Sequence, residues 1–553
     1  MNIVLLNLTR FGDLLQSQAA ISDLAAQGHK IALVCQENFA QAGTLLKHIS
    51  LVFPFQGAQT LEILAQEGKA SPEDAFGHWT RAMAGLGAWR DALHGEFVPD
   101  AVINLTPTLA ARLLALYVAG GAPCRGFALD AHGFGVNGNG WAAFLQSASV
   151  ERGVSPFNVA DLFRRAAESG GKGRPGDGSL LPPDETLREQ MAALLDAERP
   201  GACGDRLKSG EARGYVGLQL GASEDRRRWP VEYFAELGDR LWLEAGLCPV
   251  LFGSKAEAAL AERYMAVSRQ GCVNLAGRTG LQELAAALTH MKMLVTNDTG
   301  TMHLAAGLGV PVLAVFLATA QPFDTGPYRA GSCSVEPDMD CHPCAFGRAC
   351  DKGEACRRAV APDVLARLAL AKLTTGQWPA GPGAGARVWE AEDDGTGFLT
   401  LRSLSGHDDA VRSLWLALQR RYIGAYLDRA ADGAFTPPDP SCSAEGAARL
   451  PAAWRAETAG RVKTASELAL LFAQQGKVLA ATHRQGMGDR LLGTWNRVRD
   501  FLASQPGFAA LSMLWVQETQ GADKELGDVL ASAEVFHAMT AALAHALMEQ
   551  SLH

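Results

Sequence analysis

The sequence contains no long uninterrupted run of apolar residues, no excess of positive charge and no visible internal repeat. A membrane-spanning helix needs roughly 18 or more consecutive apolar residues, so we expect no integral membrane segment. The 50 lysines and arginines are outnumbered by 59 aspartates and glutamates, and the formal net charge is −9. This balance argues against a nucleic-acid partner, because a general nucleic-acid-binding protein carries a clear basic excess. The lack of a repeat gives no indication of a solenoid.

The start of the chain also lacks the features of a secretory signal peptide. The segment Met1–Leu8 is apolar, but no basic region precedes it, and Arg10 and Asp13 follow within a few residues. We interpret it as a buried strand and expect a cytoplasmic protein, in which thiols stay reduced. The 11 cysteines therefore do not predict a disulfide framework; seven are scattered, and four crowd between Cys341 and Cys356.

What is present is an ordinary globular composition with two successive α/β patterns. Hydrophobic residues make up 48% and charged residues 20% of the chain, which excludes wholesale disorder. In the first pattern, strands are predicted at Ile3–Leu8, Lys30–Cys35, Leu51–Phe55 and Ala101–Leu105, with a helix over Leu14–Gln27. After a Gly/Pro-rich segment at 170–183, strands follow at Gly214–Leu220, Cys248–Phe252, Met293–Thr296 and Pro311–Phe316, and helices at Val231–Ala245, Ala256–Ser268 and Leu281–His290. Continuous apolar strands between helices predict two parallel sheets covered on both faces, with a cleft between them.

The last part of the chain has a different pattern. A second linker at 379–386 precedes a predicted hairpin of Arg387–Glu392 and Phe398–Leu404. Helical stretches then follow at 407–430, 452–475, 486–504 and 524–549. The predicted domains are an N-terminal Rossmann-like lobe at 1–180, a second Rossmann-like lobe at 181–378 and a mostly α accessory domain at 379–553.

One segment has the features of a phosphate site. The residues Asp298-Thr299-Gly300-Thr301-Met302-His303 follow a predicted strand and open a helix. The unpaired N–H groups and the positive end of such a helix favour a phosphate or diphosphate, and Gly300 lets the backbone approach a ligand. An ordinary helix N-cap without a ligand explains the same local features.

Together with other segments, this motif resembles glycosyltransferase family 9, the heptosyltransferases. The stretch DTGTMHLAAGLGVPVLAVF from Asp298, followed by Thr325-Gly326-Pro327-Tyr328, is similar to the hallmark of the family. The other similar segments are Phe11-Gly12-Asp13, Gly221-Ala222-Ser223 with Arg227-Arg228-Trp229-Pro230, Phe252-Gly253-Ser254 with Glu257, and Asn274-Leu275-Ala276-Gly277-Arg278-Thr279. The resemblance covers roughly residues 1–375. It implies a GT-B fold and an inverting transfer, usually of heptose from ADP-heptose to a sugar hydroxyl.

The resemblance implies two catalytic residues, Asp13 and Arg227. A carboxylate at Asp13 would accept the proton of the attacking hydroxyl, a step typically worth about 10²–10⁴ in rate; its alternative role is to cap the helix that starts at Leu14. Arg227 aligns with a lysine common in the family, and would neutralise the departing diphosphate, which typically contributes about 3–4 kcal/mol. Arg226 and Arg228 are alternatives, as is a solvated charge run.

The remaining implied residues bind the donor. Glu257 is expected at the ribose hydroxyls, or else on the solvent face of a helix, and His303 is expected to hold the phosphate loop. Leu317 departs from the family, which often has glycine there. The full implied donor set is Gly221, Ser223, Gly253, Ser254, Glu257, Asp298, Thr299, Gly300, Thr301, Met302 and His303.

The four crowded cysteines, Cys341, Cys344, Cys350 and Cys356, are spaced C-x2-C-x5-C-x5-C. In a reduced compartment this spacing fits a structural four-thiolate site for Zn or Fe, which the spacing does not distinguish. A set of reduced cysteines in a loop is the alternative. Some autotransporter protein heptosyltransferases are similar here, and in them a cysteine-bound iron finger supports oligomer assembly. The segment from Asn158 to Arg165 resembles the same branch.

The function implied is transfer of heptose, or a similar sugar, from an ADP-sugar to a sugar or protein hydroxyl, in lipopolysaccharide core biosynthesis or protein glycosylation. No cofactor is expected for catalysis. The implied partners are a nucleotide-diphosphate sugar, a glycan or protein acceptor and further copies of the chain, in the cytoplasm or peripherally at the inner face of the inner membrane. The alternative is a non-catalytic nucleotide-sugar-binding or assembly protein on a GT-B scaffold, against which the presence of Asp13 argues. The Gly486-Met487-Gly488-Asp489 segment superficially repeats the GD theme and is interpreted as a loop or helix start.

Overall fold

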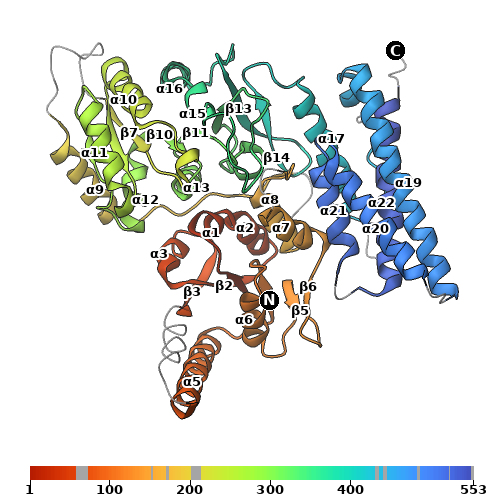
Figure 1. Cartoon of the computed structure of the whole chain (residues 1–553). Helices are drawn as coiled ribbons and strands as arrows, with labels where there is room; N and C mark the ends of the chain where they lie inside the picture. Colours follow the sequence, from red (N-terminus) through yellow and green to blue (C-terminus); the bar gives the residue numbers. More distant parts are fainter. Residues whose placement is uncertain are drawn as a thin grey trace. The chain divides into compact units, whose positions relative to one another are not determined.

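The structure is a computed structural model that describes residues 1–57, 72–150, 154–169, 174–200, 213–429, 435–439, 445–482, 486–521 and 524–549. The chain forms two compact units, coloured along the sequence in Figure 1. Unit 1 comprises Met1–Leu129 with Asn158–Ser405, and unit 2 comprises Asp130–Phe157 with Gly406–His553. The units thus combine segments differently from the predicted ranges 1–180, 181–378 and 379–553.

The first lobe of unit 1 is built on a parallel sheet in the strand order β3-β2-β1-β4-β5. Consecutive residues of β1 and β2 are buried, and because consecutive side chains point to opposite faces, both faces of the sheet are covered. The strands are β1 (Asn2–Asn7), β2 (Lys30–Gln36), β3 (Ile49–Phe55), β4 (Ala101–Asn104) and β5 (Cys124–Leu129). The helices are α1 (Phe11–Gln16), α2 (Gln18–Ala26), η1 (Glu37–Phe39), α3 (Ala40–Gly43), α5 (Pro72–Glu96) and α6 (Leu109–Ala119).

The helix predicted over Leu14–Gln27 is two helices that meet at Ser17. The Ser17 hydroxyl donates to the carbonyl oxygen of Leu14 at 2.6 Å, a local side-chain bond of the kind that competes with helical continuation. The first helix starts at Phe11, so Asp13 lies in its first turn and Arg10 is the N-cap. The alternative role considered for Asp13, as the cap of a helix starting at Leu14, is therefore wrong.

The second lobe has a sheet in the order β14-β13-β12-β11-β10-β7-β8-β9. Its strands are β7 (Gly214–Gln219), β8 (Leu247–Phe252), β9 (Val273–Asn274), β10 (Met291–Asn297), β11 (Val312–Val315), β12 (Cys333–Pro337), β13 (Ala386–Asp393) and β14 (Leu399–Ser403). Its helices are η3 (Asp225–Arg227), α10 (Val231–Ala245), η4 (Lys255–Glu257), α11 (Ala258–Val267), α12 (Leu281–Thr289), α13 (Gly300–Gly307), α14 (Pro322–Thr325), α15 (Cys356–Ala359) and α16 (Pro362–Thr375). The core contains Trp229, Phe234 and Leu241.

The hairpin predicted around Asp393–Gly397 forms as β13 and β14. It adds two antiparallel strands to the edge of the second sheet at β12, so it belongs to unit 1 rather than to the helical part of the chain. Between the lobes the chain runs through α8 (Val159–Ala166) and α9 (Glu185–Glu198). The Gly/Pro-rich segment between them has no helix or strand at 174–184, and its residues 170–173 lie outside the described part.

Unit 2 is mostly helical. It contains β6 (Gly135–Asn137), α7 (Gly140–Val150), α17 (Val411–Leu427), α19 (Ala452–Thr482), α20 (Met487–Ser504), α21 (Ala509–Thr519) and α22 (Leu526–Met548). The second GD segment is a helix start, as expected, because Gly486 is the left-handed N-cap of α20. Two parallel-sheet lobes with a mostly helical C-terminal region confirm the predicted GT-B fold class with an added α domain.

Among the described residues, α22 is the one helix whose length and composition would let it cross a membrane. The search of the sequence for an uninterrupted run of apolar residues did not identify this helix. Its residues Phe536, Met539 and Leu543 are fully buried, and α22 packs along α19. The approach is close, because a Cβ added at Gly476 of α19 would overlap the side chain of Leu530. The apolar face of α22 thus forms core of unit 2.

Candidate active site

The carboxyl ends of β7 and β10 lie side by side, because these strands are parallel neighbours in the second sheet. The fully buried side chain of Asn297 joins their loops. Its Nδ2 donates to the carbonyl oxygens of Leu220 and Gly221, both at 3.0 Å, and its Oδ1 accepts from the N–H of Trp229 at 2.9 Å. Asn297 therefore holds the Gly221 loop against the Asp298 loop, a role that the sequence reasoning missed.

Arg227 lies at the same edge with a side chain that is only 7% exposed. Its Nε and Nη2 donate to the hydroxyl oxygen of Thr319 at 2.8 and 2.5 Å. Its Nη1 is 3.6 Å from Oδ2 of Asp298, and its Nη2 is 3.8 Å from Oε1 of Glu224. The guanidinium is thereby held beside the Asp298 loop with its charge partly balanced by carboxylates.

The alternatives to Arg227 point to other partners. Arg226 pairs with Glu224 at 2.7 Å and donates to the carbonyl oxygen of Arg348 at 3.0 Å. Arg228 pairs with Asp225 at 3.2 Å. The side chains of Arg226 and Arg228 are 21% and 27% exposed. Of the three arginines, Arg227 is the one in an ion pair with the strand-end residue Asp298.

Thr319 is the second residue that the sequence reasoning missed. It is 1% exposed and follows β11, the neighbour of β10 in the sheet. The signal available in the sequence was its place just after a predicted strand, where a polar residue reaches the carboxyl edge of the sheet.

Glu257 is half-buried in η4 and faces two backbone turns. Its Oε2 accepts from the N–H and the hydroxyl of Ser254 at 2.7 and 3.0 Å, which forms a capping box. A Cβ added at Gly221 would overlap Oε1 of Glu257 and would lie 2.9 Å from Oε2. The carboxylate therefore lies against the Gly221 loop, between the ends of β7 and β8, rather than simply facing solvent. Gly253 also adjoins it, with a would-be Cβ 3.3 Å from Cβ of Glu257.

The predicted phosphate loop opens α13, with Thr299 as the N-cap. No side-chain cap bond is formed by Thr299, whose hydroxyl lies 3.2 Å from that of Thr296. Thr299 and Gly300 are half-buried, whereas Thr301, Met302 and His303 are buried. The hydroxyl of Thr301 donates to Oε1 of Gln219 at 3.2 Å. The first turn of the helix is thus held in place by side chains, while Thr299 is not sealed beneath the core.

The GD segment of the first lobe packs directly on α13. A Cβ added at Gly12 would lie 3.1 Å from Cδ2 of His303 and 3.3 Å from Cα of Gly300. A Cβ added at Gly300 would overlap Cδ1 of Phe11 and would lie 3.1 Å from its Cε1. Asp13 is half-buried in the first turn of α1, one residue after Gly12. The structure therefore brings Phe11-Gly12-Asp13 and Gly300–His303 together, from the two lobes.

The predicted residues of the second lobe thus gather at one edge of its sheet, with two qualifications. Ser223 is exposed on the Gly221 loop, and His303 lies against Gly12 at the contact between the lobes. A cavity of about 490 Å³ is lined from both lobes by residues that include Gln41, Thr44 and Gln282. It lies beside α3 and α12, and none of its lining residues belongs to the predicted site.

The cysteine cluster follows β12. Cys341 and Cys350 are exposed, Cys344 is half-buried, and Cys356 is buried at the start of α15. Burial, followed by the thiols of the other three cysteines, raises the pKa of Cys344. In the described part of the chain, no group of three or more His, Cys, Asp or Glu side chains is arranged to hold a metal ion. Thiolates are ligands that zinc and iron favour, so the residue types fit such a metal although the arrangement of the side chains does not form a site.

Comparisons with known proteins agree with the motifs. Residues 98–353 match the family model of glycosyltransferase family 9 (heptosyltransferase). The lipooligosaccharide heptosyltransferase 2 of Haemophilus ducreyi is 30% identical over 190 residues, 34% of this chain and 53% of that protein. The lipopolysaccharide heptosyltransferase 1 of Pseudomonas aeruginosa is 31% identical over 167 residues, 29% of this chain and 46% of that protein. The chain thus spans about half the length of these curated relatives.

Solved structures are also similar. The E. coli ADP-heptose lipopolysaccharide heptosyltransferase II is 18% identical, with a TM-score of 0.47 over 68% of this chain and 99% of that one. The iron-containing dodecameric glycosyltransferase TibC of enterotoxigenic E. coli is 12% identical, with a TM-score of 0.35 over 68% of this chain and 76% of that one. Residues 98–353 thus match glycosyltransferase family 9, the heptosyltransferases, and the motifs at the sheet edge agree with this match.

Proposed function

We propose that the protein is an inverting glycosyltransferase that transfers heptose, or a similar sugar, from an ADP-sugar to a sugar or protein hydroxyl. The observation that supports the proposal is the contact between α1, which carries Asp13, and α13, whose start is suited to a diphosphate. The heptosyltransferase names of the relatives support the sugar and the reaction class.

The donor binds along the carboxyl edge of the second sheet. The backbone N–H groups at Thr299–Thr301 hold the diphosphate at the positive end of α13. Arg227, held by Thr319 and Asp298, balances the charge that grows on the departing diphosphate. Glu257 accepts from the ribose hydroxyls, since its carboxylate already faces the Gly221 loop. Gly253, Ser254, Ser223, Met302 and His303 complete the proposed donor set.

Asp13 acts as the general base. The acceptor oxygen attacks the anomeric carbon from the face opposite the diphosphate, the bond from that carbon to the phosphate oxygen breaks, and the hydroxyl proton passes to Asp13. The product is the inverted glycoside and ADP, and the carboxylate is restored when its proton is lost to water. No cofactor takes part in these steps.

The acceptor and the cellular place belong to the same proposal. The lipopolysaccharide and lipooligosaccharide heptosyltransferases among the relatives favour a core sugar as the acceptor, in the cytoplasm or at the inner face of the inner membrane. A protein hydroxyl is the other acceptor. Cys341, Cys344, Cys350 and Cys356 bind a structural Zn or Fe that supports self-association, on the argument of their C-x2-C-x5-C-x5-C spacing.

The deciding experiment measures donor binding and transfer separately. Calorimetry with ADP, UDP and GDP tests the nucleotide, and release of ADP from ADP-heptose with a heptose-free lipopolysaccharide core tests transfer. Asp13→Asn is expected to keep ADP binding and to lose about 10²–10⁴ in transfer rate, whereas Arg227→Ala weakens both. Transfer by Asp13→Asn at the parent rate would refute the base assignment. ADP binding without any transfer by the parent protein would favour the non-catalytic alternative.

A further inference from the structure

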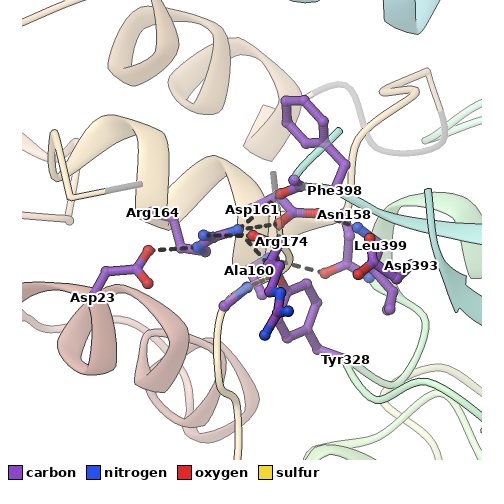
Figure 2. Close-up of polar contacts among 12 residues, drawn as sticks. Asp23, Asn158, Ala160, Asp161, Arg164, Arg174, Tyr328, Asp393, Phe398 and Leu399 are labelled. Carbon is purple, nitrogen blue, oxygen red and sulfur yellow. Dashed lines mark hydrogen bonds and ion pairs between the residues drawn. The ribbon is translucent and has the colours of Figure 1, made fainter. Parts of the chain in front are cut away.

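A second buried polar network involves none of the proposed donor-binding residues. It is centred on Asp161 and Arg164 of α8 and on Tyr328, whose side chains Figure 2 shows in contact. Asp161, Arg164 and Tyr328 are 0%, 2% and 9% exposed. Both segments were noticed in the sequence, as Asn158–Arg165 and as Thr325–Tyr328, and the reaction described above uses neither of them.

All three guanidinium nitrogens of Arg164 donate hydrogen bonds. Its Nε donates to Oδ2 of Asp23 on α2 at 2.7 Å, and its Nη1 donates to Oδ1 of Asp161 at 3.2 Å. The same Nη1 donates to the carbonyl oxygen of Gly397 at 2.9 Å, and Nη2 donates to that of Arg174 at 3.1 Å. One side chain therefore joins α2 of the first lobe, the segment between the lobes and the β13–β14 hairpin.

Tyr328 and Asp161 extend the network into the second lobe. The Tyr328 hydroxyl donates to Oδ1 of Asp161 at 2.6 Å and accepts from the N–H of Gly176 at 3.0 Å. The N–H of Leu399 donates to Oδ2 of Asp161 at 3.0 Å. Burial, followed by the negative charge of Asp161, raises the pKa of Tyr328 well above its ordinary value, so the phenol keeps the proton that it donates.

The segments that the network joins are continuous in sequence with those that carry the proposed catalytic groups. On one side, α2 follows α1 with only Ser17 between them, and α1 carries Asp13. On the other side, Tyr328 lies in the same connection between β11 and β12 as Thr319, which holds Arg227. A shift of α2 relative to this connection would change the position of Asp13 relative to Arg227.

We propose that Arg164, Asp161 and Tyr328 are positioning residues. They fix the position of the first lobe, which carries the proposed general base Asp13, relative to the second lobe, which carries the proposed donor site. The inference rests on the proposed function. A buried ion pair contributes little net stability, because loss of hydration offsets the attraction, so such a network is better suited to fixing geometry. A displacement of about 1 Å at a reacting centre costs about 10²-fold in rate.

The test separates catalysis from donor binding. In Tyr328→Phe and Arg164→Lys, we expect kcat for transfer from ADP-heptose to fall by about tenfold or more, while the KM for ADP-heptose and the Kd for ADP stay within about threefold. Donor binding is retained because the proposed donor-binding residues all lie in the second lobe. Retained ADP affinity also shows that each variant is folded.

Tyr215→Phe is a matched control. The Tyr215 hydroxyl donates to Oδ1 of Asp196 at 2.6 Å and accepts from Nε of Arg199 at 2.9 Å, so the same three residue types interact. These residues belong to α9 and β7, at the end of the sheet away from the donor edge. Tyr215→Phe is expected to lower the unfolding temperature and to leave kcat unchanged.

Two results overturn the inference. If Tyr328→Phe keeps the parent kcat, or if its kcat falls no further than that of Tyr215→Phe, the network is only structural. If the parent protein neither binds ADP nor transfers heptose, the proposed function fails and the positioning role falls with it. An active parent with an unaffected Tyr328→Phe refutes the positioning role alone.

Discussion

Gly221→Ala tests the arrangement at the donor edge most directly. An added Cβ would overlap the Glu257 carboxylate, so the Glu257 side chain must turn away. It then loses the two hydrogen bonds from Ser254, at 2.7 and 3.0 Å. Bonds to a charged group at a partly exposed site suggest a loss of about 1–3 kcal/mol in stability. Because the same carboxylate is the proposed ribose contact, ADP affinity should fall as well.

The assay is a double-mutant cycle of Gly221→Ala and Glu257→Ala. A chain of two units need not unfold in one step. Scanning calorimetry therefore follows the unfolding transition whose midpoint temperature changes when ADP is added. Gly221→Ala should lower this transition by roughly 2–8 °C. In the Glu257→Ala background the same change should have almost no effect, because the carboxylate that it displaces is gone.

Gly280→Ala is the control. Gly280 also donates its N–H to a capping glutamate, Glu283, at 2.7 Å, but its added Cβ would lie 3.7 Å from that carboxylate, an ordinary contact. Its effect should stay within about 1 kcal/mol, the range for this change at an N-cap. If Gly221→Ala and Glu257→Ala are additive within about 0.5 kcal/mol, the carboxylate does not lie where this reasoning requires.

Three further outcomes are expected. Asn297→Ala should destabilise unit 1 by about 2–4 kcal/mol and weaken ADP binding, measured by calorimetry, because it leaves three buried backbone groups unsatisfied. A thiol reagent at pH 8 should label the exposed Cys341 and Cys350 well before Cys35, whose pKa burial raises to about 11, and a bound metal should block the first two until a chelator removes it. Burial raises the pKa of Tyr215 to about 12 from 10.0, so the stability that it contributes is complete below pH 10 and is lost between about pH 10 and 12; Tyr215→Phe should flatten unfolding temperature against pH in that window.

The strands and the main motifs could be predicted because their signals are local. The runs Ile3–Leu8 and Lys30–Cys35 are apolar throughout and form buried parallel strands, as expected. The helix start at Val231 follows from Pro230, and the start at Gly300 follows from Asp298 and Thr299, which are typical helix-start residues. The predicted donor residues lie at strand ends, and the carboxyl ends of neighbouring parallel strands necessarily meet at one edge of the sheet.

The features that escaped prediction depend on partners distant in the sequence. The sequence around Asn297 does not predict its hydrogen bonds to Gly221 and Trp229. The sequence around Arg164 likewise does not predict its hydrogen bonds to Asp23 and Gly397. The β13–β14 hairpin was predicted correctly as a hairpin, but its place at the edge of the second sheet depends on β12, a strand that the pattern did not identify.

The contact between Gly12 and Gly300 shows how the two kinds of information combine. Each glycine lies at or near the start of a helix. From the neighbouring sequence alone, either glycine would be explained by the backbone freedom that glycine provides. Neither has a left-handed backbone, however, and the space beside each is filled by the opposite lobe: by His303 next to Gly12 and by Phe11 next to Gly300. Small size rather than backbone freedom is therefore what these positions require. The two motifs of the resemblance are thus halves of one packed surface, in which small residues let α1, with the proposed base Asp13, pack closely on the proposed phosphate loop at the start of α13.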